Sequence, residues 1–241
     1  MIKLIIFDLD GVLVEAKNIH FEALNEALGK EYAISWNEHL STYDGLKTVQ
    51  KLEMLTTNKK LPKTDHETIW QKKQKITLKK LKQLKEDDNL ISVMKSLTES
   101  GYELAVCSNS IRKTVLTVLS KLGVMEYMDL VISNEDVKNS KPHPEMYWKA
   151  ISMMSKLPEE TLIIEDSPYG LLAAARSKSH ILRVVNPDEV TYDNITKKII
   201  KIEKGNTMKT PKWHDDTLNI LIPMAGAGSR FEKAGYTFPK P

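Results

Sequence analysis

The sequence lacks the features that mark secreted, membrane-spanning and disulfide-built proteins. Its 241 residues include one cysteine, Cys107, so no internal disulfide can form and a reducing compartment is expected. No apolar run approaches the ~18 residues of a membrane-spanning helix. The N-terminus leads directly into the apolar IKLIIF, without the charged leader and cleavage site of a signal peptide. These absences predict a soluble, cytoplasmic protein with no membrane partner.

A strong net charge is also missing. The 35 Lys and Arg nearly balance the 32 Asp and Glu, for a formal net charge of +3, which suits an anionic small molecule as well as nucleic acid. The most basic stretch, residues 71–85, holds seven lysines and no acid. We interpret it as a solvated helix face with Ile76, Leu81 and Leu84 turned inward. Because it has no interleaved aromatic residues to stack on bases, we expect no nucleic-acid partner.

The sequence does contain five short apolar runs, rich in Ile, Leu and Val and largely without polar alternation. They lie at residues 2–7, 102–108, 129–133, 161–165 and 181–185. This pattern is typical of parallel strands buried on both faces. Segments of helical period separate them, one ending at Gly123 and another beginning at Ser167 as N-cap before Pro168. Strands that alternate with helices predict an α/β fold with a doubly wound parallel sheet.

One long stretch interrupts this alternation. Residues 15–89 have a helical pattern throughout and no convincing strand, as an insertion between the first and second strands would. We therefore expect a sheet domain from residues 1–14 and 90–202, with residues 15–89 inserted into it. Residues 203–216 are polar and read as a linker. Residues 217–241 begin with a new apolar run and read as the start of a further domain.

Polar residues follow four of the apolar runs, where each predicted strand ends. They are Asp8 and Asp10 after the first run, Ser108 and Asn109 after the second, Lys141 in the loop after the third, and Glu165 and Asp166 at the end of the fourth. Ligands bind beyond the carboxyl ends of strands in open parallel sheets, so these groups are expected at one edge.

The chemistry of this set points to phosphoryl transfer. Each carboxylate would repel a phosphate dianion by ~4 kcal/mol per charge pair at 4 Å and an effective dielectric of 20. A divalent cation such as Mg²⁺ reverses that sign, and Lys141 can neutralise remaining charge. One aspartate of the pair Asp8 and Asp10 could then attack phosphorus, while the other carries the proton of the leaving oxygen.

These residues resemble the four motifs of the haloacid dehalogenase (HAD) superfamily, in its branch with a helical cap after the first strand. The matching stretches, within residues 2–190, are DLDGV at 8–12, the turn at Ser108, SKPHPE around Lys141 and IIEDSPYG at 163–170. Four motifs in order, each after its own predicted strand, are far more specific than a lone pair of aspartates. The resemblance implies a Rossmann-like core with a mobile helical cap at residues 15–89.

The resemblance also implies a role for each residue. Asp8 would be the nucleophile, Asp10 the general acid and base, Lys141 the charge-balancing group, and Ser108 the phosphoryl holder, assisted by the amide of Asn109. Mg²⁺ would be bound by Asp8, the backbone carbonyl of Asp10 and Asp166, with Glu165 acting through water. His20 resembles a histidine that helps link cap closure to catalysis, although a satisfied helix-start histidine is nearly as good an interpretation.

Two activities fit this pattern, because it resembles both β-phosphoglucomutases and phosphoglycolate-type phosphatases. The mutases carry a cap arginine for the second phosphate of their substrate, and here Thr48 stands near that place with Lys47 beside it. We therefore expect a Mg²⁺-dependent phosphatase acting on a small phosphorylated metabolite, a sugar or polyol phosphate. Gly45 and Lys47 are candidate substrate contacts. A phosphomutase and a non-catalytic module remain alternatives.

The last 24 residues, LNILIPMAGAGSRFEKAGYTFPKP, resemble the opening signature of sugar-phosphate nucleotidyltransferases. The resemblance implies that a glycine-rich loop, with Gly226, Gly228, Ser229 and Arg230, wraps a nucleoside triphosphate, and that Lys240 contacts phosphate. One strand and one loop cannot bury a core. We therefore expect a stub or remnant of a covalent fusion to such a transferase domain, without transferase activity of its own.

Overall fold

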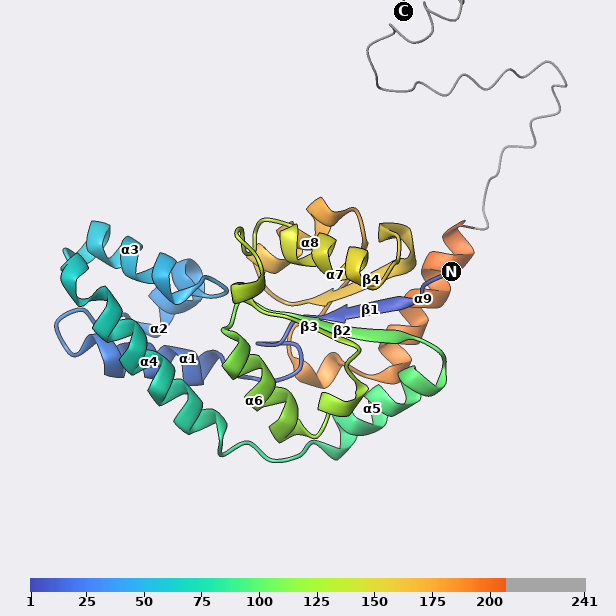
Figure 1. The fold of residues 1–241 in the computed structure, drawn as a ribbon, viewed down its shortest axis with the longest axis horizontal. Coiled ribbons are helices and arrows are strands. Elements are labelled where there is room, and N and C mark those ends of the chain that lie inside the picture. The colour runs from blue at the N-terminus through green and yellow to red at the C-terminus, as the bar shows by residue number, and fades with distance from the viewer. Residues whose placement is uncertain (207–241) are drawn as a thin grey trace, which may run out of the picture. The chain divides into compact units, whose positions relative to one another are not determined.

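The computed structural model of the chain describes residues 1–206 (Figure 1). The predicted nucleotidyltransferase-like segment at 217–241, and all but the first few residues of the predicted linker at 203–216, lie outside this range. Among residues 1–206, no helix is both long and apolar enough to cross a membrane.

The described chain contains five strands and nine α-helices. The strands are β1 (Leu4–Phe7), β2 (Glu103–Cys107), β3 (Leu130–Ile132), β4 (Thr161–Glu165) and β5 (His180–Arg183). The helices are α1 (Lys17–Leu28), α2 (Trp36–Glu38), α3 (Thr48–Lys59), α4 (His66–Leu81), α5 (Asp88–Glu99), α6 (Arg112–Leu122), α7 (Glu145–Met153), α8 (Pro168–Ser177) and α9 (Tyr192–Asn206). All five predicted strands are therefore confirmed, with ends that differ by at most two residues.

The strands form one parallel sheet in the order β3-β2-β1-β4-β5. Strand β1 lies at its centre, where Ile5 pairs with Leu104 of β2 on one side and Leu162 of β4 on the other. Every residue of β1 is buried, as its unbroken apolar sequence predicts. The central strand therefore delivers Asp8, the residue that follows it, to the middle of the sheet's carboxyl edge.

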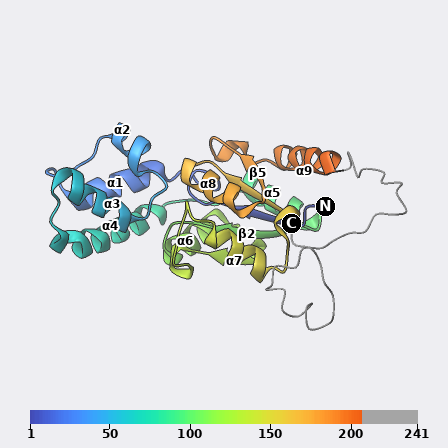
Figure 2. The same cartoon turned by 90° about the horizontal axis from the view of Figure 1, so that it is seen from above.

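Helices cover both faces of the sheet (Figures 1 and 2). Alternate side chains of β1 point to opposite faces, so Ile5 and Phe7 belong to the core under α5, α6 and α9, whereas Leu4 and Ile6 belong to the core under α7 and α8. Cys107 lies fully buried in the second core. The predicted helix ends are confirmed at Gly123, which ends α6 at φ 75°, and at Ser167, which accepts a hydrogen bond from the N–H of Gly170.

Helices α1–α4 are inserted between β1 and β2 and have an apolar core of their own, formed by residues such as Leu24, Leu52 and Leu55. They lie to one side of the sheet in both views (Figures 1 and 2). The predicted helical insertion is confirmed, and we call α1–α4 the cap. The exact domain boundaries at residues 15 and 89 stay predictions.

The interpretation of residues 71–85 as a solvated face was wrong at three polar positions, Lys73, Gln74 and Thr77, which are buried. Lys73 is only 7% exposed, and it belongs to a stripe along α4 with Ile69, Thr77 and Leu81, all buried. These residues recur every four positions and so share one face of the helix. Leu81 does turn inward as expected, but the same face also carries a lysine into the protein.

Candidate active site

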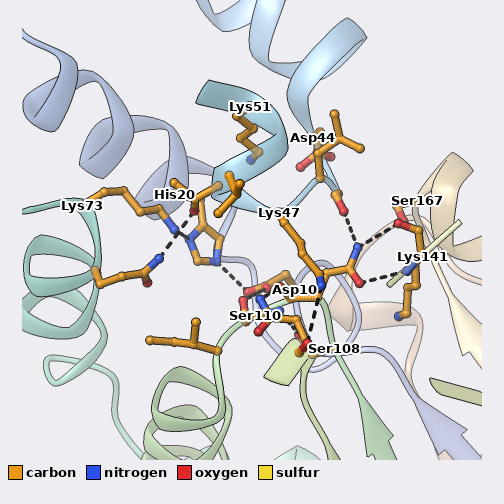
Figure 3. Close-up of a pocket in the computed structure, with 18 of the residues that line it drawn as sticks. Asp10, His20, Asp44, Lys47, Lys51, Lys73, Ser108, Ser110, Lys141 and Ser167 are labelled. Atoms are coloured by element: carbon orange, nitrogen blue, oxygen red, sulfur yellow. Dashed lines mark hydrogen bonds and ion pairs between the residues drawn. The ribbon is translucent and has the colours of Figure 1, made fainter. Parts of the chain in front are cut away.

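A cavity of about 280 Å³ lies between the carboxyl edge of the sheet and the cap. Loops after β1, β2, β3 and β4 contribute to its lining, as do α1, α3, α4 and the loop before α3. Figure 3 shows side chains from both parts pointing into it. Its lining includes all but two of the residues proposed from the sequence within the described range; Glu165 and Asp166 are not among the lining residues.

Lys141 is the centre of a buried ion cluster. Its Nζ lies 2.5 Å from Oδ1 of Asp8 and 2.5 Å from Oε1 of Glu165, and it donates to the carbonyl oxygen of Cys107 at 2.8 Å. Tyr147, fully buried, donates its hydroxyl to the same Glu165 oxygen at 2.6 Å. Burial favours a neutral lysine, but Asp8 and Glu165 outweigh it and raise the pKa of Lys141 above its usual range. Lys141 therefore carries a fixed positive charge beside Asp8.

Three carboxylates meet beside this ammonium group. Asp8, Glu165 and Asp166 are all buried, and each offers an oxygen within 4.8 Å of the others. Burial raises the pKa of Asp8 well above its ordinary value against the pull of Lys141, and neighbouring acids add to the rise. Burial likewise raises the pKa of Asp166 to about 6, although Lys17 opposes it. So much negative charge in one buried place calls for a further cation.

The geometry around Asp166 fits a metal ion. Its Oδ1 has no partner among residues 1–206, although it is buried. Its Oδ2 forms an ion pair with Nζ of Lys17 at 2.7 Å. Hard divalent cations such as Mg²⁺ take carboxylate oxygens of this kind. Asp8, Glu165 and Asp166 could therefore hold a metal.

Asp10 is held by two partners. Ser110 donates its hydroxyl to Oδ2 at 2.9 Å, and the ring of His20 lies 3.0 Å from Oδ1. Burial alone would raise the pKa of Asp10, but His20 and Ser110 lower it to about 2, so the carboxylate is ionised. His20 must then carry its proton on Nε2, which leaves Nδ1 to accept a hydrogen bond from Lys73 at 3.3 Å. A hydrogen-bonded chain thus joins the cap to Asp10.

The loop after β2 fastens the cap loop to the core. Ser108 is buried beside the cavity, and its Oγ accepts from the N–H of Ser110 at 3.0 Å. The side-chain amide of Asn109 donates to the carbonyl oxygens of Gly45 at 2.8 Å and Lys141 at 3.3 Å. Asn109 therefore bridges three segments that are far apart in the sequence, a structural task that the sequence did not indicate.

The two cap residues proposed as substrate contacts also reach the cavity. Gly45 lies in its lining with a φ of 74°, a left-handed conformation that glycine adopts freely. Lys47 precedes α3 and reaches the carbonyl oxygen of Asn134 at 3.4 Å. The predicted nucleotide-binding residues lie outside the described range; they are Gly226, Gly228, Ser229, Arg230 and Lys240.

Sequence reasoning missed several residues of the site: Lys17, Lys51, Lys73, Ser110 and Tyr147. Ser110 lies two residues after Ser108 in the same turn, so its proximity was a usable signal. Lys73 is one of the seven lysines of residues 71–85, and only its position on the same face of α4 as Ile69 and Leu81 distinguishes it from the others.

The fold and this site define a hydrolase built on a parallel sheet with a cap over its carboxyl edge. Residues 5–184 match the model of the haloacid dehalogenase-like hydrolase family, and the chain belongs to that family. The expectation drawn from the four motifs is therefore confirmed, and the chain is an enzyme of the phosphatase type that this family contains.

Individual proteins of known name agree with this assignment. The chain is 28% identical over 177 residues to a phosphorylated carbohydrates phosphatase of Thermotoga maritima, which covers 70% of this chain and 79% of the relative. It is 25% identical over 182 residues to the pyrophosphatase PpaX of Anoxybacillus flavithermus, covering 71% and 78%. The fold is similar to that of β-phosphoglucomutase from Clostridium difficile, with a TM-score of 0.75 at 20% identity, covering 85% of this chain and all of the other.

Proposed function

We propose that this chain is a Mg²⁺-dependent phosphatase that hydrolyses a small phosphorylated metabolite, a sugar or polyol phosphate, through a phosphoryl group carried on Asp8. One observation carries the proposal. Asp8, Asp10, Ser108 and Lys141, from three different loops, line the same cavity beside an acidic cluster suited to a metal. The named phosphatase relatives support the substrate class, and the single buried cysteine favours a cytoplasmic location.

We assign Asp8 the role of the nucleophile. Its carboxylate lies at the end of the central strand, where Lys141 neutralises part of the local charge. Attack by an Asp8 oxygen forms a bond to phosphorus while the bond from phosphorus to the substrate oxygen breaks. Ser108 is placed to hold the transferring group through its hydroxyl. When bound, the metal would offset the charge of the phosphoryl oxygens and bring them close to the carboxylates.

We assign Asp10 the role of the general acid and base. It lies two residues after Asp8 and faces the same cavity, held there by His20 and Ser110. In the first step a protonated Asp10 gives its proton to the departing substrate oxygen. In the second step Asp10 takes a proton from water, which attacks phosphorus and releases phosphate from Asp8. The ionised Asp10 seen here corresponds to the base required in the second step.

Hydrolysis is favoured over the phosphomutase alternative by what lies at the place of the mutase arginine. Thr48 is buried there, and its hydroxyl lies 3.5 Å from the side-chain amide nitrogen of Gln74. It offers no guanidinium group for a second phosphate. A mutase would convert a sugar 1-phosphate into its 6-phosphate without releasing phosphate, so product analysis separates the two activities. A covalent fusion to a nucleotidyltransferase domain stays a prediction from the sequence.

The test is phosphate release from a panel of sugar and polyol phosphates, with Mg²⁺ and after chelation. We expect Asp8→Asn to lower kcat by at least about a thousandfold, because an amide cannot replace the attacking carboxylate. Asp188→Asn is the matched control, since Asp188 is an exposed acid outside the cavity lining, and it should keep full activity. Full turnover by Asp8→Asn would overturn the proposal.

A further inference from the structure

Lys17 stands at a place in its helix that disfavours positive charge. It is the first residue of α1, where the helix dipole presents its positive end. The N-cap residue, Ala16, makes no side-chain hydrogen bond to the helix, and the first turn of α1 contains no acid. The interactions within α1 therefore give no reason for a lysine at this position.

The charge of Lys17 is instead compensated by a residue of the core. Its Nζ lies 2.7 Å from Oδ2 of Asp166, which directly follows β4, and this is the only ion pair or hydrogen bond of the ammonium group within residues 1–206. Asp44 and Glu15 attract it through space, but no ion pair joins them to it. The contact thus connects the first helix of the cap to the acidic cluster at the sheet edge.

The two ammonium groups of this cluster differ in how firmly they are held. Lys141 is 2% exposed, and two carboxylates and a backbone carbonyl oxygen hold its Nζ. Lys17 has one carboxylate, and its side chain is 21% exposed. An ammonium group with a single partner and access to solvent can turn outward and become hydrated, whereas a buried one with three partners cannot. Lys17 is therefore the cation of the cluster that can leave.

The balance of charges in the cluster gives this difference a consequence. The carboxylates of Asp8, Glu165 and Asp166 face the two ammonium groups. When a divalent ion joins the ionised carboxylates, the cluster carries one excess positive charge if Lys17 stays and none if Lys17 leaves. Cations held close together in a buried site repel each other strongly. The metal and Lys17 are thus alternative partners for the carboxylate of Asp166.

We propose that Lys17 competes with the divalent metal for Asp166 and thereby sets the metal affinity of the active site. The inference rests on the proposed function, because the phosphatase mechanism needs that metal. Lys17 acts here as a positioning residue: its effect passes through Asp166, and it has no part in the reaction at phosphorus. Because Lys17 belongs to α1, metal binding also releases a contact between the cap and the core.

Calorimetric titration of the full chain with Mg²⁺ alone tests this competition. The chain is first treated with a chelator, and the titration is run at pH 8, above the pKa of about 6 of Asp166. We expect Lys17→Met to bind Mg²⁺ about tenfold or more tightly than the wild type, because the competing cation is gone. Lys17→Arg keeps the charge and should bind Mg²⁺ as the wild type does. Lys30→Met is the matched control, since Lys30 is exposed and outside the cavity lining, and it should leave the affinity unchanged.

Urea unfolding gives a second readout at the same pH. With chelator present, Lys17→Met should be less stable than the wild type, because the buried carboxylate of Asp166 has lost its counterion. The gain in stability on adding Mg²⁺ should be larger in Lys17→Met than in the wild type, because the variant binds the metal more tightly. A lysine that merely stabilised the fold would lower stability by the same amount with and without the metal.

These measurements use no substrate, which keeps them separate from the phosphatase proposal. If no phosphate ester is hydrolysed, the phosphatase proposal fails, while tighter Mg²⁺ binding by Lys17→Met still supports the competition. The competition is overturned if Lys17→Met binds Mg²⁺ with wild-type affinity, or more weakly, since Lys17 would then be a bystander or would orient Asp166 for the metal. It is also overturned if neither protein binds Mg²⁺.

Discussion

At the scale of single residues, the catalytic set and the cap lysines differ in how readily the sequence revealed them. Asp8, Asp10 and Lys141 each follow an apolar run, so strand topology alone brought them to one edge. Lys51 and Lys73 lie inside helices, where no sequence feature distinguishes a buried lysine from an exposed one until its neighbours are known. The position of polar residues directly after strands thus predicted the catalytic residues. The cap lysines could be identified only once the packing of the cap helices was known.

At the scale of secondary-structure elements, the sequence predicted which helices and strands form better than it predicted which of their side chains are buried. Apolar runs without alternation identified all five strands, and Ser167 before Pro168 identified the start of α8. The buried stripe on α4 was misjudged, because the seven lysines of residues 71–85 outweighed the four-residue spacing that links Ile69, Lys73, Thr77 and Leu81. The charge composition of a helix indicates how exposed the helix is on average. Whether one particular side chain is buried depends on the element that packs against it.

The first turn of α8 packs tightly against Glu165 of the acidic cluster. A Cβ atom on Gly170 would overlap the carboxylate of Glu165, so glycine is required there by close approach. Helix propensity alone favours alanine over glycine by ~0.5–1 kcal/mol. We expect the opposite sign: Gly170→Ala should lower the free energy of unfolding by about 1–3 kcal/mol, because Glu165 or the helix must shift.

Urea unfolding with and without Mg²⁺ measures this effect. The stabilisation by Mg²⁺ should also shrink in Gly170→Ala, because Glu165 belongs to the acidic cluster that fits a metal. Gly205→Ala is the control, since nothing lies within 4 Å of a Cβ at that helical position, and it should not destabilise the protein. A Gly170→Ala protein as stable as the wild type, with full Mg²⁺ response, would contradict the expected overlap.

At the scale of the whole molecule, two bodies of opposite character face one cavity. The sheet edge contributes the carboxylates of Asp8 and Asp10 to the cavity lining, while the cap contributes Lys51 and Lys73. Among the described residues Lys51 is buried without an ion pair, which is expected to cost folding stability.

Replacing Lys51 with methionine should therefore stabilise the fold. The pKa of Lys51 is about 8 in the folded chain against 10.5 ordinarily, so below pH 8 the folded state bears the full cost of the buried charge. Between pH 8 and 10.5 the unfolded chain binds the extra proton, and wild-type stability gains as the pH rises. At pH 7 we expect Lys51→Met to raise the free energy of unfolding by about 1–3 kcal/mol.

Urea unfolding at pH 7 and at pH 10.5 checks this expectation, because the advantage of Lys51→Met should shrink at the higher pH, where the wild-type lysine is neutral. Lys75→Met, an exposed substitution on the next helix, should change stability little at either pH. A Lys51→Met protein less stable than the wild type would mean that the ammonium group supports the cap itself. A more stable variant with lower phosphatase activity would show that the lysine is kept for function and against folding stability.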